Sequence, residues 1–127
     1  MKIFGIGTDI IEVNRIKKSL KSEIFLSRLF NKNEILKCKK KINSSNCFAK
    51  RFAAKEAFSK ALGTGIAKGI NFNEIIVLNE KNGKPFIKLL NKTKKNVEKK
   101  LKKKKYKISL SLSDEKKYAV AFVTISI

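Results

Sequence analysis

Alternating apolar and polar positions predict β-strands at both ends of this chain. The N-terminal run Lys2–Ile11 is largely apolar, and Lys107–Ser113 places an aliphatic side chain at every second position. A further apolar run, Tyr118–Ile127, follows a short charged turn. We therefore expect an N-terminal strand and a C-terminal pair of strands.

Between these strands, two segments have the pattern of longer helices. Cys47–Leu62 is rich in Ala, contains neither Gly nor Pro, and stops at Gly63, a common residue at a helix C-terminus. Because apolar residues occur on two sides of its helical wheel, this segment is predicted to be a central helix. Lys92–Lys105 is predicted to form a lysine-rich surface helix with Val97 and Leu101 as its apolar anchors.

Shorter sequence patterns predict two short helices and a loop in the rest of the N-terminal half. Asn14 is positioned to cap a short basic helix. Asn31 and Glu34 form a capping-box pattern, which predicts a second short helix toward Lys41. The polar composition of Lys41–Asn46 predicts a loop before the central helix.

A hairpin is predicted by Asn82-Gly83, which lies between two β-like runs, Glu74–Asn79 and Pro85–Leu90. The chain of 127 residues has the length of one domain and shows no repeat or linker. We therefore predict a single α+β domain over residues 1–127, in which a small antiparallel sheet packs against the long central helix and shorter helices.

Charge is the strongest compositional signal. Lys and Arg number 31 against 10 Asp and Glu, a formal net charge of +21, and the only arginines are Arg15, Arg28 and Arg51. Such a charge attracts polyanions in general. The guanidinium of Arg matches the geometry of a phosphate group better than the ammonium of Lys does. No apolar run approaches the length that spans a bilayer. Cys38 and Cys47 have no CxxC partner, so we expect neither a disulfide framework nor a zinc knuckle, and a cytoplasmic location.

The absence of His excludes His-based triads and imidazole bases, so carboxylates and lysines must carry any chemistry. Glu56 lies in the middle of an apolar side of the central helix, where an unpaired carboxylate is costly to desolvate. A metal ion or Lys60, one turn later, could neutralise it. The alternative is an ordinary i,i+4 pair of Glu56 and Lys60 on a wet face, and the pattern does not decide between the two.

A second carboxylate, Asp9, directly follows the strand that contains Gly5-Ile6-Gly7. Two carboxylates from separate elements, with Lys and Arg close by, form an arrangement that Mg²⁺ favours in phosphate chemistry. This pattern indicates a phosphate-linked metal site without naming a reaction.

Longer motifs resemble those of a known enzyme family. The first motif is Gly5-Ile6-Gly7-Thr8-Asp9-Ile10-Ile11-Glu12, followed by Asn14-Arg15-Ile16. The second is Arg51-Phe52-Ala53-Ala54-Lys55-Glu56-Ala57-Phe58-Ser59-Lys60-Ala61-Leu62-Gly63-Thr64-Gly65-Ile66. With Asn82-Gly83-Lys84-Pro85 and a closing Tyr118-Ala119-Val120-Ala121 in the same order, they are similar to bacterial holo-(acyl-carrier-protein) synthases, a type of 4'-phosphopantetheinyl transferase.

The resemblance implies a reaction and an assembly. Members transfer the 4'-phosphopantetheine moiety of coenzyme A to a serine of apo acyl carrier protein, in support of fatty acid biosynthesis (EC 2.7.8.7). The products are holo acyl carrier protein and adenosine 3',5'-bisphosphate. The family's fold is implied as well, together with a homotrimer that has active sites between neighbouring subunits.

The resemblance also implies roles for individual residues. Asp9 and Glu56 would be the Mg²⁺ ligands, Glu56 and Lys60 the catalytic residues, and the serine proton would pass to Glu56 or to a metal-bound water. Contacts to coenzyme A are implied at Arg51, Ser59, Lys60, Gly83, Lys84 and Pro85. Docking of the acidic carrier protein is implied at Arg15, Lys17, Lys18, Lys21 and Arg28.

Charge alone would support an alternative, a basic RNA-binding or ribosome-associated module. That alternative gives no role to Asp9 or Glu56. The lysine-rich stretch also lacks interleaved aromatic residues that stack on bases, apart from Tyr106. We therefore expect coenzyme A and acyl carrier protein as partners, and neither nucleic acid nor a membrane.

Overall fold

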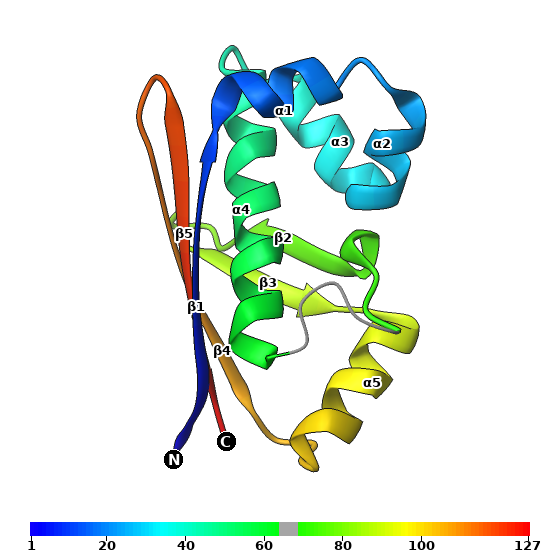
Figure 1. Cartoon of the computed structure of the whole chain (residues 1–127), viewed down its shortest axis with the longest axis vertical. Helices are drawn as coiled ribbons and strands as arrows, with labels where there is room; N and C mark the ends of the chain where they lie inside the picture. The colour runs from blue at the N-terminus through cyan, green and yellow to red at the C-terminus, as the bar shows by residue number, and fades with distance from the viewer. Residues whose placement is uncertain (64–68) are drawn as a thin grey trace.

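The computed structural model describes residues 1–63 and 69–127. One long helix, α4, runs through the centre of the molecule, and the other elements surround it (Figure 1). In chain order the elements are β1 (Ile3–Glu12), α1 (Val13–Ser19), α2 (Glu23–Leu29), α3 (Lys32–Lys39), α4 (Ser44–Leu62), the 3₁₀ turn η1 (Phe72–Glu74), β2 (Ile75–Asn79), β3 (Pro85–Leu89), α5 (Asn91–Leu101), β4 (Lys107–Asp114) and β5 (Tyr118–Ser126).

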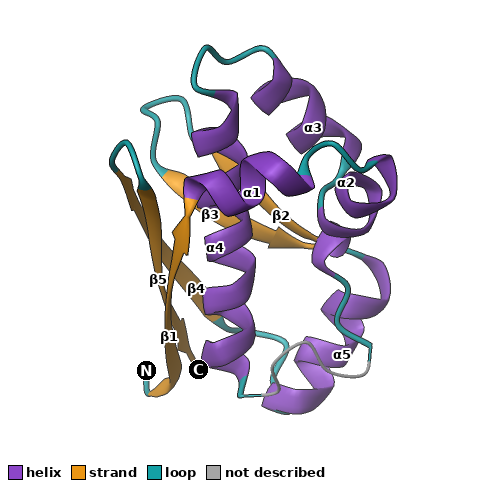
Figure 2. Ribbon diagram, turned by 45° about the horizontal axis from the view of Figure 1, so that its top comes forward, coloured by secondary structure: helices purple, strands orange, loops and turns teal. Residues whose placement is uncertain are grey.

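The strands form two antiparallel sheets. One has the order β1-β5-β4, and the other is the β2-β3 hairpin. The three-stranded sheet covers one side of α4, while α1, α2 and α3 gather at one end of the molecule and α5 lies toward the other (Figures 1 and 2). The predicted α+β class, with an antiparallel sheet against a long helix, is confirmed, although the strands divide between two sheets.

Two glycines bring β1 unusually close to α4. Gly5 and Gly7 face the helix, and a Cβ atom on either would overlap the carbonyl oxygen of Ala61 or Ala57, respectively. Glycine is therefore required here for close backbone approach rather than for a turn. Because side chains alternate along a strand, Asp9 is the next residue on the same face and meets α4 as well.

Several local predictions are confirmed. Asn31 and Glu34 form the capping box of α3, with Asn31 N donating to Glu34 Oε1 over 3.0 Å. Gly63 ends α4 in the left-handed conformation with φ of 88°. The β2-β3 hairpin turns at Gly83, which has φ of 90°.

Other local predictions are wrong, for identifiable reasons. Asn14 does not cap α1, because the helix begins at Val13, whose N–H donates to Lys117 O over 2.8 Å as a continuation of strand pairing. Helix α4 begins at Ser44 rather than Cys47, which shortens the predicted loop. Helix α5 ends at Leu101, its last buried anchor, and Lys102 takes a left-handed conformation.

Helix α2 was missed because its sequence signal is weak. It has only two turns and one buried residue, Leu26, so it shows no apolar periodicity. Its start is nevertheless capped, since Phe25 N donates to Ser22 Oγ over 3.2 Å.

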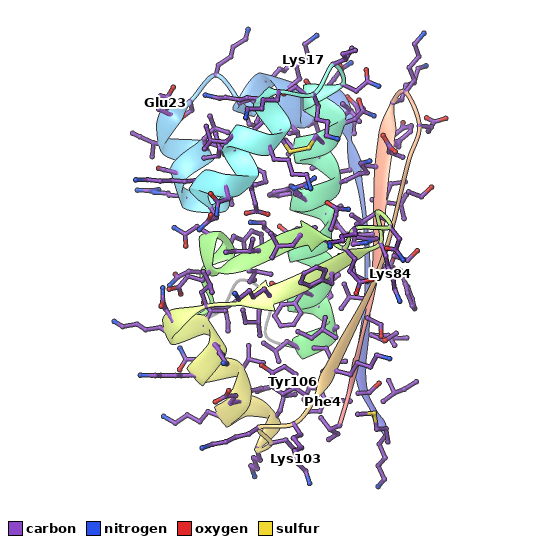
Figure 3. The ribbon with its side chains drawn as sticks, turned by 180° about the vertical axis from the view of Figure 1, so that it is seen from behind. Phe4, Lys17, Glu23, Lys84, Lys103 and Tyr106 are labelled. Carbon is purple, nitrogen blue, oxygen red and sulfur yellow. A yellow bond between two sulfur atoms is a disulfide. The ribbon has the colours of Figure 1, made fainter. Side chains whose placement is uncertain are left out.

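The expectation for the cysteines is also corrected. Cys38 near the end of α3 and Cys47 in the first turn of α4 form a disulfide, with their Cα atoms 5.4 Å apart (Figure 3). The short connection between the two helices folds the chain back and brings the sulfur atoms together, which the spacing of the two residues in sequence does not indicate. Within residues 1–63 and 69–127, no helix combines the length and apolar character required for crossing a membrane.

Candidate active site

The two carboxylates predicted to act together are brought to one place by the close packing of β1 on α4. Lys60 Nζ donates to Thr8 O over 2.9 Å and lies 3.3 Å from Asp9 Oδ1. The Asp9 side chain is 16% exposed and that of Lys60 55% exposed, so solvent reaches this ion pair. Among the described residues, Lys60 thus pairs with Asp9, and the predicted alternative of an isolated Glu56–Lys60 pair is wrong.

Glu56 lies one helical turn before Lys60 and close to Asp9. Burial raises its pKa, the negative charge of Asp9 raises it further, and Lys60 acts in the opposite direction. The pKa of Asp9 is likewise raised by burial, against the hydrogen bond and charge of Lys60 and the charge of Arg15. Two half-buried carboxylates that repel each other form a site that a divalent cation would stabilise.

The donor set fits Mg²⁺ better than a metal held only by protein ligands. No cluster of three or more His, Cys, Asp or Glu side chains occurs in the part of the chain that is described. Mg²⁺ is commonly bound by one or two carboxylates, with water and phosphate oxygens as its other ligands. Asp9 and Glu56 are sufficient for that mode of binding.

A basic cleft of about 880 Å³ opens elsewhere on the surface, beside α3, the start of α4 and the β2-β3 turn. Five cationic side chains line it: Lys37, Lys40, Lys41, Lys50 and Arg51. Arg51 is only 5% exposed, yet among the described residues it has no carboxylate within ion-pair distance. A buried guanidinium held by neutral groups at the wall of a cleft is suited to bind an anion.

The structure separates the residues predicted to contact coenzyme A. Arg51 and Gly83 line the basic cleft, whereas Lys84 and Pro85 do not. Ser59 is buried on α4, and its Oγ has no hydrogen-bond partner within the described ranges. The end of the second sequence motif, Thr64–Ile66, lies outside the described residues.

The cleft and the carboxylate pair face different sides of α4. Arg51 and Glu56 are five residues apart, which corresponds to a rotation of about 140° around a helix. Both features therefore belong to the same helix but open in different directions.

The residues predicted to bind a protein partner are all exposed at one end of the molecule. Arg15, Lys17 and Lys18 lie on α1, Lys21 follows it, and Arg28 lies on α2. Lys17 marks this end in Figure 3, whereas Lys103 lies at the opposite end. The lysine-rich segment around α5 is thus separate from the basic surface of α1 and α2.

Comparison with known proteins shows the family to which this chain belongs. The family model for the 4'-phosphopantetheinyl transferase superfamily matches residues 5–123. The chain is 52% identical over 125 residues to the holo-(acyl-carrier-protein) synthase of Pelagibacter ubique, covering 98% of each chain. It is 44% identical over 125 residues to that of Vibrio campbellii, covering 97% of each. This chain belongs to the 4'-phosphopantetheinyl transferase superfamily.

Solved structures of the superfamily agree with the fold. A holo-(acyl-carrier-protein) synthase from Neisseria meningitidis superimposes with a TM-score of 0.88 at 37% identity, covering 98% of this chain and 99% of the other. The enzyme from Bacillus anthracis, described as a complex with coenzyme A (3',5'-ADP), gives a TM-score of 0.81 at 39% identity, covering 99% and 98%. The matching region includes both the carboxylate pair and the basic cleft.

One phosphopantetheinyl transferase motif residue has a role that sequence reasoning missed. Lys55 is fully buried beside Glu56, and its Nζ lies 2.6 Å from Glu34 Oε1. It also donates to the carbonyl oxygens of Leu29 and Phe72 over 2.7 and 2.9 Å. No local sequence pattern indicates this role, because Glu34 lies 21 residues away and is recognisable in the sequence only as a capping residue. Its second oxygen, Oε2, accepts a hydrogen bond from Val77 N.

Proposed function

We propose that this chain is a holo-(acyl-carrier-protein) synthase that transfers 4'-phosphopantetheine from coenzyme A to a serine of apo acyl carrier protein, releasing adenosine 3',5'-bisphosphate. The observation that carries this proposal is the placement of Asp9, Glu56 and Lys60 together, within a chain that matches its family over almost its whole length. A single phosphopantetheinyl transferase domain over residues 1–127, acting in the cytoplasm in fatty acid biosynthesis, is part of the proposal.

Asp9 and Glu56 would hold Mg²⁺, which when bound would neutralise charge on the pyrophosphate of coenzyme A. Lys60 reaches the same place from the exposed side of α4. Its ammonium would leave Asp9 to bind the pyrophosphate and stabilise negative charge on the leaving group. Glu56 would accept the serine proton, since its carboxylate lies beside Asp9 and Lys60 at the place where the pyrophosphate would bind.

The nucleotide half of coenzyme A would bind in the basic cleft, through the buried cation of Arg51 and the turn at Gly83. Because the cleft and the carboxylate pair face different sides of α4, we propose that one coenzyme A spans two neighbouring copies of the chain. It would meet the carboxylates of one copy and the cleft of the next.

A homotrimer is the proposed assembly, and the outer face of the β1-β5-β4 sheet is the surface that supports it. This face carries exposed apolar side chains, namely Ile6, Ile10, Tyr118 and Phe122, of which Ile6 is 60% exposed and Ile10 64% exposed. Large apolar side chains gathered on one sheet face are typical of a surface that is covered in an assembly. Light scattering coupled to size-exclusion chromatography measures the mass directly, and a monomer at micromolar concentration would contradict the trimer.

The reaction itself is tested by mass spectrometry of the carrier protein. Incubation of apo acyl carrier protein with the purified protein, coenzyme A and Mg²⁺ should add the mass of phosphopantetheine, and EDTA should prevent the addition. Glu56→Gln should lower the rate about a hundredfold or more because it removes a charge that stabilises the bound cation. Full activity of this variant would contradict the assignment of Glu56, whereas an inactive wild-type protein would contradict the function.

The docking surface is tested by charge reversal on α1. Replacing Arg15 and Lys18 by Glu should raise KM for acyl carrier protein, since electrostatic complementarity with an acidic partner sets encounter and orientation. The dissociation constant for coenzyme A should be affected less. Replacing Lys94 and Lys95 on α5 by Glu is the matched control, because it changes the net charge equally at a different surface. An equal rise of KM in both double variants would indicate a nonspecific charge effect.

A further inference from the structure

A single asparagine at the end of β2 joins three parts of the basic cleft. Asn79 Oδ1 accepts from Lys37 Nζ over 2.9 Å and from Arg51 Nη2 over 3.3 Å. Asn79 Nδ2 donates to Gly83 O over 2.9 Å. This side chain thus connects α3, α4 and the β2-β3 turn, and all four residues line the cleft.

Arg51 depends on such neutral partners to keep one orientation. Its Nη1 lies 3.1 Å from Cys47 Sγ, and its Nη2 binds Asn79, while Nε has no partner among the described residues. A neutral acceptor orients a guanidinium without neutralising it, whereas a carboxylate at the same place would compete with an anionic ligand. The positive charge of Arg51 therefore remains available to the cleft.

The turn at the mouth of the cleft is fixed by the same asparagine. Glu80 N donates to Lys84 O over 2.8 Å, and Gly83 N donates to Glu80 O over 2.9 Å, which closes the turn on itself. The bond from Asn79 to Gly83 O then ties the turn back to the strand. The position of the turn is in this way linked to that of Arg51.

One layer deeper, the same three elements are joined by a rigid ion pair. Glu34 on α3 binds Lys55 on α4 through Oε1 and Val77 N on β2 through Oε2. Each residue of this deeper set has a counterpart in the cleft on the same element. Lys37 lies three positions from Glu34, Arg51 four from Lys55, and Asn79 two from Val77, so each counterpart projects from the same face nearer to solvent. The contacts of Glu34 therefore keep α3, α4 and β2 at a constant spacing, and the contacts of Asn79 depend on that spacing.

We propose that Asn79 is a positioning residue for the nucleotide end of coenzyme A, acting through Arg51 and the Gly83 turn. This inference rests on the proposed function, since it assumes that the cleft binds that part of the substrate. Asn79 orients the guanidinium and the turn toward the same anionic ligand and leaves the charge of the guanidinium free to bind it.

The test uses adenosine 3',5'-bisphosphate as the probe, with titration calorimetry on the full chain. Asn79→Ala should raise its dissociation constant about tenfold, as expected for loss of a hydrogen bond to a charged group. KM for coenzyme A should rise in parallel, with KM for acyl carrier protein little changed. Asn73→Ala is the matched control, because Asn73 also donates to a backbone carbonyl, Ser27 O, over 3.2 Å, but lies outside the cleft.

Two further variants separate positioning from a merely structural role. Asn79→Asp keeps an acceptor oxygen but adds a charge beside Arg51, so it should weaken binding more than Asn79→Ala does. In an Arg51→Ala background, the effect of Asn79→Ala should shrink to less than about threefold, because only its action through the Gly83 turn then remains. Equal effects of Asn79→Ala in both backgrounds, or tighter binding by Asn79→Asp, would overturn the inference.

Failure of the inference can be told apart from failure of the function. A wild-type protein that modifies acyl carrier protein and binds the probe, with variants that bind it equally well, would overturn only the role of Asn79. A wild-type protein that neither binds the probe nor modifies the carrier would overturn the function and the inference with it.

Discussion

Three lysines of helix α4 each meet a carboxylate. Two of these pairs, Lys55 with Glu34 and Lys60 with Asp9, have opposite character. Lys55 and Glu34 are 2.6 Å apart and both side chains are 0% exposed. Lys60 and Asp9 are 3.3 Å apart, and Lys60 is 55% exposed. Each pair joins a lysine of the same helix to a carboxylate, so the surroundings account for what each pair can do.

The difference lies in how completely each ammonium is satisfied. Lys55 has three acceptors, the carboxylate and two backbone carbonyls, which matches its three N–H donors. Burial lowers its pKa to about 8, although the charge and hydrogen bond of Glu34 act in the opposite direction. Among the described residues Lys60 has two acceptors, and its side chain is 55% exposed, so it can exchange one anionic partner for another. A saturated buried pair has no donor left for a ligand, whereas an unsaturated exposed pair remains available to a substrate.

The largest expected effect comes from breaking the buried pair. Lys55→Met should lower the free energy of unfolding by about 3–5 kcal/mol, because Glu34 is left as an uncompensated buried charge. Lys60→Met should cost under about 1 kcal/mol, as is usual for an exposed ion pair. Urea denaturation of both variants measures the contrast. Similar losses in the two variants would mean that burial does not distinguish the pairs.

For catalytic activity we expect the opposite emphasis, with the exposed pair of Lys60 and Asp9 mattering most. Lys60→Met should reduce kcat by about a hundredfold, since it removes a cation expected to stabilise charge on the leaving group. Lys95→Met on α5 is the control for loss of one exposed lysine and should leave kcat unchanged. If Lys60→Met retained full kcat with normal stability, Lys60 would have no part in the reaction.

The smallest effect concerns the coupling between Asp9 and Glu56. The charge of Asp9 helps to raise the pKa of Glu56, so Asp9→Asn should lower this pKa toward 4.5 in metal-free protein. A carboxyl whose pKa is raised on folding holds its proton more tightly in the folded state, so stability falls as pH rises through that range. Asp9→Asn should therefore lose less stability than the wild-type protein as pH rises through this range. NMR titration of the Glu56 carboxyl measures the shift, and an unchanged pKa would mean that the two groups do not interact.

The lysine pairs also mark the limit of prediction from sequence. The capping box of Asn31 and Glu34 was predictable because both partners lie within one helical turn. The second role of Glu34, as the partner of Lys55, crosses 21 residues and leaves no local pattern. Likewise, Lys60 was expected near Glu56 on the same helix, and its bond to Asp9 spans 51 residues.

The sequence by itself determined the main elements, the spacing that puts Gly5, Gly7 and Asp9 on one face of a strand, and the motifs that indicate a phosphopantetheinyl transferase. These features depend on neighbouring residues, whose geometry follows from the periods of strand and helix. Only the tertiary structure decided which lysine is buried, that Cys38 and Cys47 are joined, and that Asn79 holds Arg51 across 28 residues. Such contacts are made when separate elements pack together, so their distances depend on the whole fold rather than on any one segment.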